Sequence, residues 1–260
     1  MKMYGKALVD YYDLFFTGLK GDVAFYVEEA QEAGSPVLEL GCGTGRVLIP
    51  VAESGIEIAG LDASKDMLSL IRLKVSELGE SVRSRIEIVE GDMTGFSMGR
   101  KFNLVMIPCR TFLHLLTPDE QRKALGCIGE HLADNGKLIV NVFDPRLDVL
   151  LDDPNAPGQI EETIDPKSGN RVTMRCSAVH DLQRQVLEAD FTYEEFDGEG
   201  RMVSQVHAPL TLRWIYRYEM QYLLELCGFT VEALYGDFER GPFRYGGEQI
   251  WVARKEAAGG

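Results

Sequence analysis

Short apolar runs alternate with amphipathic segments through residues 37–143. Continuous apolar runs predict buried strands, and apolar residues recurring every three or four positions predict helices. The predicted elements are strand 37–40, helix 45–54, strand 56–61, helix 64–78, strand 85–89, strand 102–107, helix 118–132 and strand 136–143. Because these strands alternate with helices and are apolar throughout, we expect a parallel sheet with helices on both faces.

Other patterns flank this core. Residues 4–33 carry apolar side chains at helical spacing and predict one or two helices, which end at Gly34-Ser35-Pro36. Residues 146–170, rich in Pro, Asp, Asn and Gly, predict a long connection. Period-two alternation predicts three antiparallel strands, over 171–179, 186–196 and 201–213. A helix over 216–227 and strands over 229–236 and 248–254 complete the chain.

The predicted fold is α/β, with a doubly wound, mostly parallel, seven-stranded sheet and an inserted antiparallel β meander. Residues 1–145 and 214–256 are expected to form the core with an N-terminal helical cap. Residues 146–213 are expected to form the inserted subdomain, which we interpret as a lid or a dimer contact.

Composition narrows the class of partner. A net charge of −14 argues against a nucleic-acid partner, because such proteins need a basic surface to displace counterions. The apolar runs are too short to cross a membrane, and the N-terminus has no signal-peptide pattern. The five cysteines form no C-x-x-C pair, so neither a disulfide framework nor a metal site is indicated. We therefore expect a cytoplasmic protein.

The run Val37 to Arg46 predicts a buried strand, a glycine-rich turn and the start of a helix. Glycines 41, 43 and 45 leave the turn without β-carbons, so a ligand can lie against bare backbone. The spacing is G-x-G-x-G. The dinucleotide fingerprint G-x-G-x-x-G fails, because its last glycine would fall at Arg46. The turn therefore favours S-adenosylmethionine over a nicotinamide cofactor.

Four segments in order carry a wider similarity: LELGCGTG at 38–45, GLDASKDML at 60–68, EGDM at 90–93 and FNLVMIPCRTFLHL at 102–115. In these segments the chain resembles the class I, seven-strand, S-adenosylmethionine-dependent methyltransferases of the small-molecule type. The resemblance implies S-adenosyl-L-methionine as cofactor. It also implies in-line transfer of a methyl group to an N or O nucleophile of a small-molecule acceptor.

Two carboxylates at predicted strand ends can bind the nucleoside part of the cofactor. Asp62 can accept hydrogen bonds from both ribose hydroxyls, or it can cap the helix that follows. Asp92 can accept from the adenine amino group while the Met93 N–H donates to a ring nitrogen, or it can form a simple turn. We favour the ligand role for both carboxylates.

The resemblance extends the cofactor site to further positions. The expected cofactor contacts are Tyr12, Glu39, Gly41, Cys42, Gly43, Arg46, Asp62, Ala63, Met67, Asp92, Met93 and Pro108. Glu39 is expected to hold the methionine end indirectly, and Arg46 to pair with the methionyl carboxylate or lie exposed on the helix. Met67 covers the adenine or packs in the core, and Tyr12 closes over the cofactor or packs on the sheet.

The sequence defines the acceptor site less well than the cofactor site. Arg110 can hold an anionic acceptor, and His114 can take a proton. Cys109 has no recognisable base beside it, so we interpret it as part of the wall of the acceptor site. The sequence identifies no catalytic base. Two alternatives stay open: a non-catalytic S-adenosylmethionine-binding protein and a dinucleotide-dependent oxidoreductase.

Overall fold

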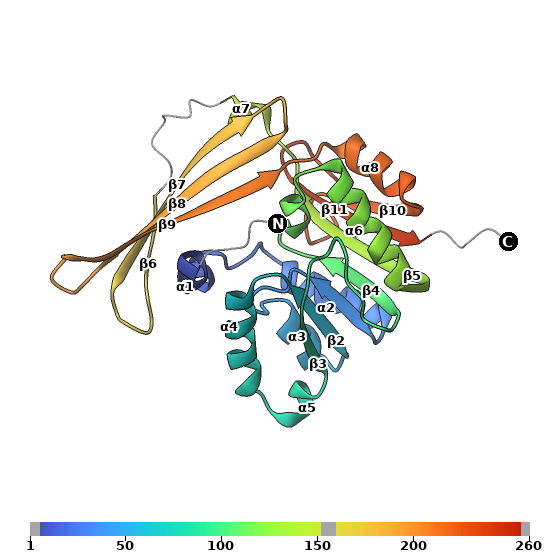
Figure 1. Cartoon of the computed structure of the whole chain (residues 1–260), viewed down its shortest axis with the longest axis horizontal. Helices are drawn as coiled ribbons and strands as arrows, with labels where there is room; N and C mark the ends of the chain where they lie inside the picture. Colours follow the sequence, from blue (N-terminus) through green and yellow to red (C-terminus); the bar gives the residue numbers. More distant parts are fainter. Residues whose placement is uncertain (1–5, 152–159, 256–260) are drawn as a thin grey trace. The chain divides into compact units, whose positions relative to one another are not determined.

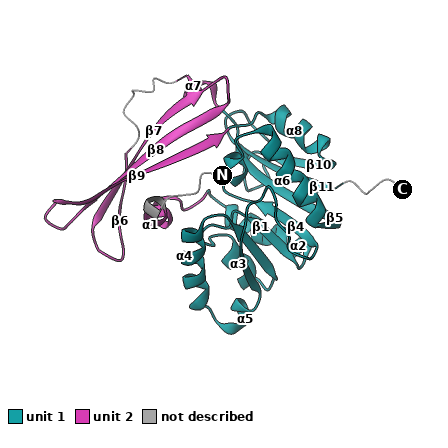
Figure 2. Cartoon of the chain, in the orientation of Figure 1, with its two compact units in different colours: residues 1, 19–145, 214–260 teal, residues 2–18, 146–213 magenta. Residues whose placement is uncertain are grey.

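The computed structural model describes residues 6–151 and 160–255. The chain divides into two compact units (Figure 2). The first comprises Leu19–Pro145 and Trp214–Gly260, and the second comprises Lys2–Gly18 and Arg146–Arg213. None of the helices in the described ranges is long and apolar enough to span a membrane.

The first unit is built on a seven-stranded sheet of order β10-β11-β5-β4-β1-β2-β3 (Figure 1). Its strands are β1 Val37–Leu40, β2 Ile58–Asp62, β3 Ile86–Glu90, β4 Phe102–Ile107, β5 Leu132–Phe143, β10 Phe229–Tyr235 and β11 Glu248–Lys255. Strands β3, β2, β1, β4 and β5 pair in parallel, and β11 runs antiparallel to both of its neighbours. The predicted α/β class and the mostly parallel sheet are confirmed.

Helices connect these strands. They are α2 Asp22–Ala33, α3 Leu48–Glu53, α4 Lys65–Ser76, α5 Glu80–Arg83, the 3₁₀ helix η1 Thr111–His114, α6 Pro118–His131 and α8 Arg217–Leu226. Local capping explains where the longer ones begin. Ser64 accepts from the Met67 N–H at the start of α4, and Thr117 and Glu120 form a capping box at the start of α6.

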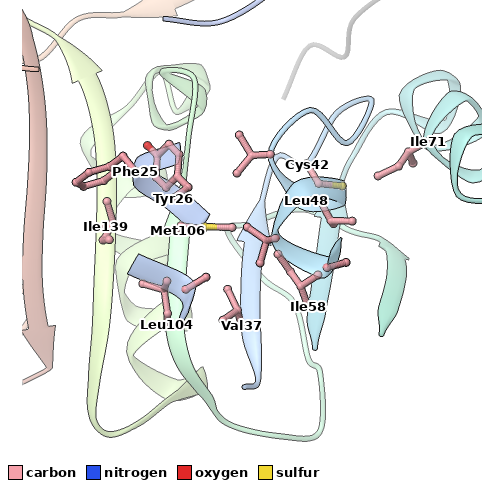
Figure 3. Close-up of a cluster of buried hydrophobic side chains, with 14 of the residues drawn as sticks. Phe25, Tyr26, Val37, Cys42, Leu48, Ile58, Ile71, Leu104, Met106 and Ile139 are labelled. Atoms are coloured by element: carbon pink, nitrogen blue, oxygen red, sulfur yellow. The ribbon is translucent and has the colours of Figure 1, made fainter. Parts of the chain in front are cut away.

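The core of the first unit lies between the sheet and its covering helices (Figure 3). Val37, Leu104 and Ile139 come from three adjacent strands, and Phe25 comes from α2 and Leu48 from α3. All five side chains are at most 1% exposed. Burial of the central strands β1, β2 and β4 on both faces explains why they are mostly apolar.

The second unit is a four-stranded antiparallel sheet of order β6-β7-β8-β9 with the helix α1 Lys6–Phe15 and a short helix α7 Leu147–Leu150. Its strands are β6 Ile160–Ile164, β7 Arg171–Asp181, β8 Val186–Phe196 and β9 Met202–Arg213. The predicted meander is present with an additional edge strand. Most of β6 is exposed, so its sequence has no buried face and no period-two signal.

Helix α1 belongs with this second sheet, which corrects the expectation that it caps the core. The ring of Tyr11 stacks on Tyr193 at 5.0 Å, and Phe16 meets Phe191 edge-on at 5.6 Å. The aromatic face of the helix thus covers the apolar face of the meander. Spacing along the sequence predicted the helix but not which sheet would cover its aromatic face.

Candidate cofactor and acceptor site

The glycine turn lies where the strand order of the sheet reverses. Strand β1 has β2 on one side and β4 on the other, both parallel to it. In open parallel sheets the carboxyl edge at such a switch point is the usual ligand site. Residues directly after β1, β2 and β4 are therefore brought to one edge, as the sequence predicted.

The three glycines of the turn have different surroundings. All have positive φ, at 73°, 51° and 86° for Gly41, Gly43 and Gly45. A Cβ on Gly41 would lie 2.1 Å from Thr111, and one on Gly45 would lie 2.7 Å from Ile71. A Cβ on Gly43 would meet nothing within 4 Å. Gly41 and Gly45 thus allow close packing, whereas Gly43 presents bare backbone to open space.

Asp62 joins the turn to the start of α4. Its Oδ2 accepts from the Gly43 N–H at 2.8 Å and its Oδ1 accepts from the Ser64 N–H at 2.8 Å. Ser64, rather than Asp62, caps α4. Burial raises the pKa of Asp62, and the backbone N–H groups of Ser64, Gly43 and Ala63 oppose this. Each carboxylate oxygen keeps a second lone pair for a ligand hydroxyl.

Replacing Asp62 by alanine should weaken binding of S-adenosylhomocysteine about tenfold or more. The change removes an acceptor of charged hydrogen bonds, which are worth roughly 1.5–3 kcal/mol. It also leaves the Gly43 N–H without its acceptor. Titration calorimetry measures the affinity and circular dichroism checks the fold. Unchanged affinity would remove Asp62 from the ribose site.

The adenine candidates lie at the ends of β2 and β3. The Oδ1 of Asp92 accepts from the N–H and the hydroxyl of Thr94, so the carboxylate also forms the turn that was its alternative role. Met67 and Met93 are buried, at 1% and 2% exposure, while Ala63 is half-buried. Adenine contacts by these residues stay predictions.

Glu39 is buried within the sheet, just before the turn. It is 3% exposed, and its Oε2 has no hydrogen-bond partner among the described residues. Burial raises the pKa of Glu39 well above its usual value, and the nearby Arg46 guanidinium opposes this rise. A buried carboxyl oxygen without a partner fits a site that is completed by a ligand donor.

Arg46 is tied to Asp22, a residue for which the sequence showed no motif. Its Nη1 and Nη2 donate to the two oxygens of Asp22 at 3.0 and 2.6 Å, and Nη2 lies 2.6 Å from the Cys109 Sγ. Burial lowers the pKa of Arg46, but the hydrogen bonds and charges of Asp22 and Cys109 together outweigh it and the net shift is upward. Arg46 is therefore not the freely exposed helix residue of the alternative interpretation.

The loop after β4 is backbone-strained. Cys109 and Arg110 have positive φ, at 55° and 62°, and both precede η1. Consecutive non-glycine residues in this region cost energy, and such strain clusters at functional sites. Pro108 is buried, and its carbonyl accepts from the N–H and hydroxyl of Thr111.

Arg110 forms an ion pair with Glu248, the first residue of β11. Asn141 on β5 donates to the Glu248 Oε2 at 2.8 Å, and the Arg110 guanidinium also lies over the Phe143 ring. The cationic group that we expected for an anionic acceptor is thus paired with a carboxylate. Sequence reasoning missed Glu248 and Asn141, because β5 and β11 carry no motif.

His114, at the end of η1, is half-buried, and burial lowers its pKa to about 4. The imidazole is neutral at pH 7, a state in which it can accept a proton or a hydrogen bond.

The lowered His114 pKa predicts a pH-dependent stability. The unfolded chain binds the proton below about pH 6.5, whereas the folded protein binds it only near pH 4. His114 should therefore decrease the free energy of unfolding by up to about 3 kcal/mol as the pH falls from 6.5 to 4. Urea unfolding should show a smaller loss for His114→Gln than for the wild type.

Tyr12 belongs to the second unit, where it stacks on Phe16 with ring centroids 4.9 Å apart. It packs with the aromatic face of α1 that covers the meander. Its contact with the cofactor stays a prediction.

S-Adenosylmethionine fits the described edge of the first unit. Gly43 provides open space against bare backbone, Asp62 keeps lone pairs for hydroxyls, and Glu39 has an oxygen without a partner. We expect Gly43 to lie against the cofactor, Asp62 to bind its ribose and Glu39 to lie at its methionine end.

Comparison with known proteins agrees with this fit. Residues 37–136 match the sequence model of a methyltransferase domain family. The chain is 27% identical to dTDP-3-amino-3,4,6-trideoxy-alpha-D-glucopyranose N,N-dimethyltransferase of Streptomyces venezuelae, over 90% of this chain and 94% of the relative.

Solved structures show the same fold over nearly the whole chain. CcbJ methyltransferase of Streptomyces caelestis superposes with a TM-score of 0.80 at 24% identity, covering 97% of this chain and 98% of that one. SAM-bound CalS10 of Micromonospora echinaspora, an amino pentose methyltransferase, has a TM-score of 0.70 at 19% identity and covers 95% and 96%. The chain thus carries a methyltransferase domain over residues 37–136 and shares the fold of S-adenosylmethionine-dependent methyltransferases over nearly its whole length.

Proposed function

We propose that this methyltransferase transfers the methyl group to an amino nitrogen of a small molecule, such as an amino sugar. The observation that carries the proposal is the carboxylate of Glu248, held beside the loop after β4 by Arg110 and Asn141. A fixed carboxylate suits an acceptor that arrives as an ammonium ion. The names of CalS10 and of the Streptomyces venezuelae relative, both sugar-amine methyltransferases, support the same class.

The cofactor supplies a methyl group already activated by the sulfonium. The protein mainly has to align the acceptor nitrogen and exclude water. Beyond its bonds to Arg110 and Asn141, Glu248 keeps one spare lone pair, on Oε1, so it can accept a hydrogen bond from the ammonium ion.

A matched set of acceptors tests the proposal. The protein with S-adenosylmethionine labelled in the methyl group is incubated with amino sugars, free and linked to dTDP, and with the same sugars carrying a hydroxyl in place of the amine. We expect label in an amino sugar and none in its hydroxyl analogue. Transfer to the hydroxyl analogues, or no transfer to any amine while the cofactor binds, would contradict the proposal.

Glu248→Gln provides the variant test. It removes the charge but keeps the size and a hydrogen-bonding group, so we expect the KM for the amine to rise about tenfold or more. Cofactor affinity should stay near the wild-type value. Glu232→Gln is a matched control. Glu232 is an exposed residue of β10 that pairs with Arg254, so its replacement should leave the KM unchanged.

We further propose that the protein acts in the cytoplasm, without a nucleic-acid partner, and as a homodimer through the meander. Support for the dimer comes from apolar side chains exposed on the two edge strands of the second sheet: Ile160 and Ile164 on β6, and Met202 and Val203 on β9. Light scattering after size-exclusion chromatography measures the mass, and a monomer at micromolar concentration would contradict the dimer.

A further inference from the structure

The first residue of α2, Asp22, contacts the arginine that follows the glycine turn. Asp22 and Tyr26 are four residues apart and so share one face of the helix. Asp22 is 5% exposed and binds Arg46 through both carboxylate oxygens, at 3.0 and 2.6 Å. The bidentate geometry fixes the orientation of the guanidinium plane as well as its position.

This ion pair does not use all of the guanidinium. One N–H group of Nη1 and one of Nη2 donate to Asp22, and a further Nη2 N–H lies against the Cys109 Sγ. The remaining N–H groups have no partner in the described ranges 6–151 and 160–255. The Arg46 side chain is 21% exposed, so these N–H groups are accessible to an acceptor on a ligand.

Two buried polar side-chain atoms also lack hydrogen-bond partners among the described residues. They are the Tyr26 hydroxyl and the Glu39 Oε2. Burial raises the Tyr26 pKa, and the charges of Asp22 and Glu39 raise it further, so both carboxyl groups lie within its electrostatic range. Arg46 acts in turn on the Glu39 pKa. Glu39 is thus within electrostatic range of both Arg46 and Tyr26.

We propose that Asp22 is a positioning residue that holds Arg46 to bind the α-carboxylate of the methionine part of the cofactor. Asp22 does not touch the cofactor itself. It fixes the guanidinium so that the unused N–H groups meet the carboxylate, which would satisfy the donors left over by the ion pair. The proposal rests on S-adenosylmethionine as cofactor and is independent of the acceptor.

Two ligands that differ only in the amino-acid part can distinguish a positioning role of Asp22 from a general structural role. S-Adenosylhomocysteine carries the carboxylate, and 5′-methylthioadenosine keeps the nucleoside and the sulfur but lacks it. By titration calorimetry, Asp22→Asn should raise the Kd of S-adenosylhomocysteine about tenfold and leave that of methylthioadenosine within about twofold. Arg46→Gln should show the same selectivity, and the double variant should lose no more than Arg46→Gln alone.

Asp22→Ser is a second variant that keeps a side-chain oxygen for the N–H groups of Leu19 and Val23, which Asp22 now binds. Glu28→Gln is the matched control, because Glu28 lies on the same helix and pairs with Arg240. It should leave both affinities unchanged. Equal losses for the two ligands, or an unchanged or tighter affinity for S-adenosylhomocysteine in Asp22→Asn, would overturn the proposal. No acceptor enters this experiment, so its outcome is separate from that of the acceptor test.

Discussion

Replacing Gly43 by valine is expected to abolish binding of S-adenosylhomocysteine while the fold stays intact. A Cβ at this position enters space that holds no protein atom within 4 Å, so the branched side chain costs little packing in the free protein. The same space is where a ligand would approach the backbone of the turn. The side chain and the cofactor therefore compete for one volume. Calorimetry should show no binding up to millimolar ligand, with a near-native circular dichroism spectrum.

Two controls separate the loss of space from backbone strain. Gly55 also has positive φ, at 99°, and a Cβ there meets nothing within 4 Å, so Gly55→Val imposes similar strain away from the turn. It should lower stability by about 1–2 kcal/mol and leave affinity unchanged. Gly41→Ala and Gly45→Ala should instead destabilise the fold, because Thr111 and Ile71 occupy the space. Retained binding in Gly43→Val would mean that the cofactor lies elsewhere.

The sheet of the first unit was predictable because its strands are buried on both faces. Val37–Leu40 and Phe102–Ile107 have the bounds predicted from their apolar runs. Boundaries next to the glycine turn were harder. Helix α3 begins at Leu48 rather than at residue 45, because Gly45 has φ 86° and cannot continue a right-handed helix.

Side chains that act through the fold were not predictable. Asp22 and Glu248 stand outside every motif, and only the topology brings α2 to the glycine turn and β11 to the loop after β4. By contrast Gly43 and Asp62 lie at strand ends, where the parallel sheet itself dictates that they meet. A motif therefore located the turn and the carboxylate, while their ion-pair partners needed the three-dimensional arrangement.

Replacing residues 171–212 by a short Gly/Ser linker is expected to leave cofactor affinity largely intact and to abolish acceptor turnover. The expected cofactor residues lie in the first unit, with the exception of Tyr12. The replaced strands carry an apolar face, including Phe191 and Tyr193, that the seven-stranded sheet does not need for its own core. We expect the second unit to contribute to acceptor binding through these strands.

Point variants on one strand provide a sharper version of the same prediction. Phe191 and Thr192 are adjacent on β8 and so point to opposite faces of the sheet. Phe191 packs with Phe16, the residue that follows α1, whereas Thr192 contacts His207 on the exposed face. Phe191→Ala should therefore raise the acceptor KM about tenfold or more with cofactor affinity unchanged, and Thr192→Ala should change neither.

The linker variant exposes the aromatic face of α1, so a second version that also lacks residues 1–18 guards against aggregation. Both versions should bind S-adenosylhomocysteine within about tenfold of the parent protein, because Gly43, Asp62 and Asp92 are retained. Radiolabelled methyl transfer to the acceptor measures turnover. If the linker variant that keeps α1 still methylated its acceptor at the parent rate, the meander would have no part in acceptor binding. The aromatic face of α1 alone would then be left to carry it.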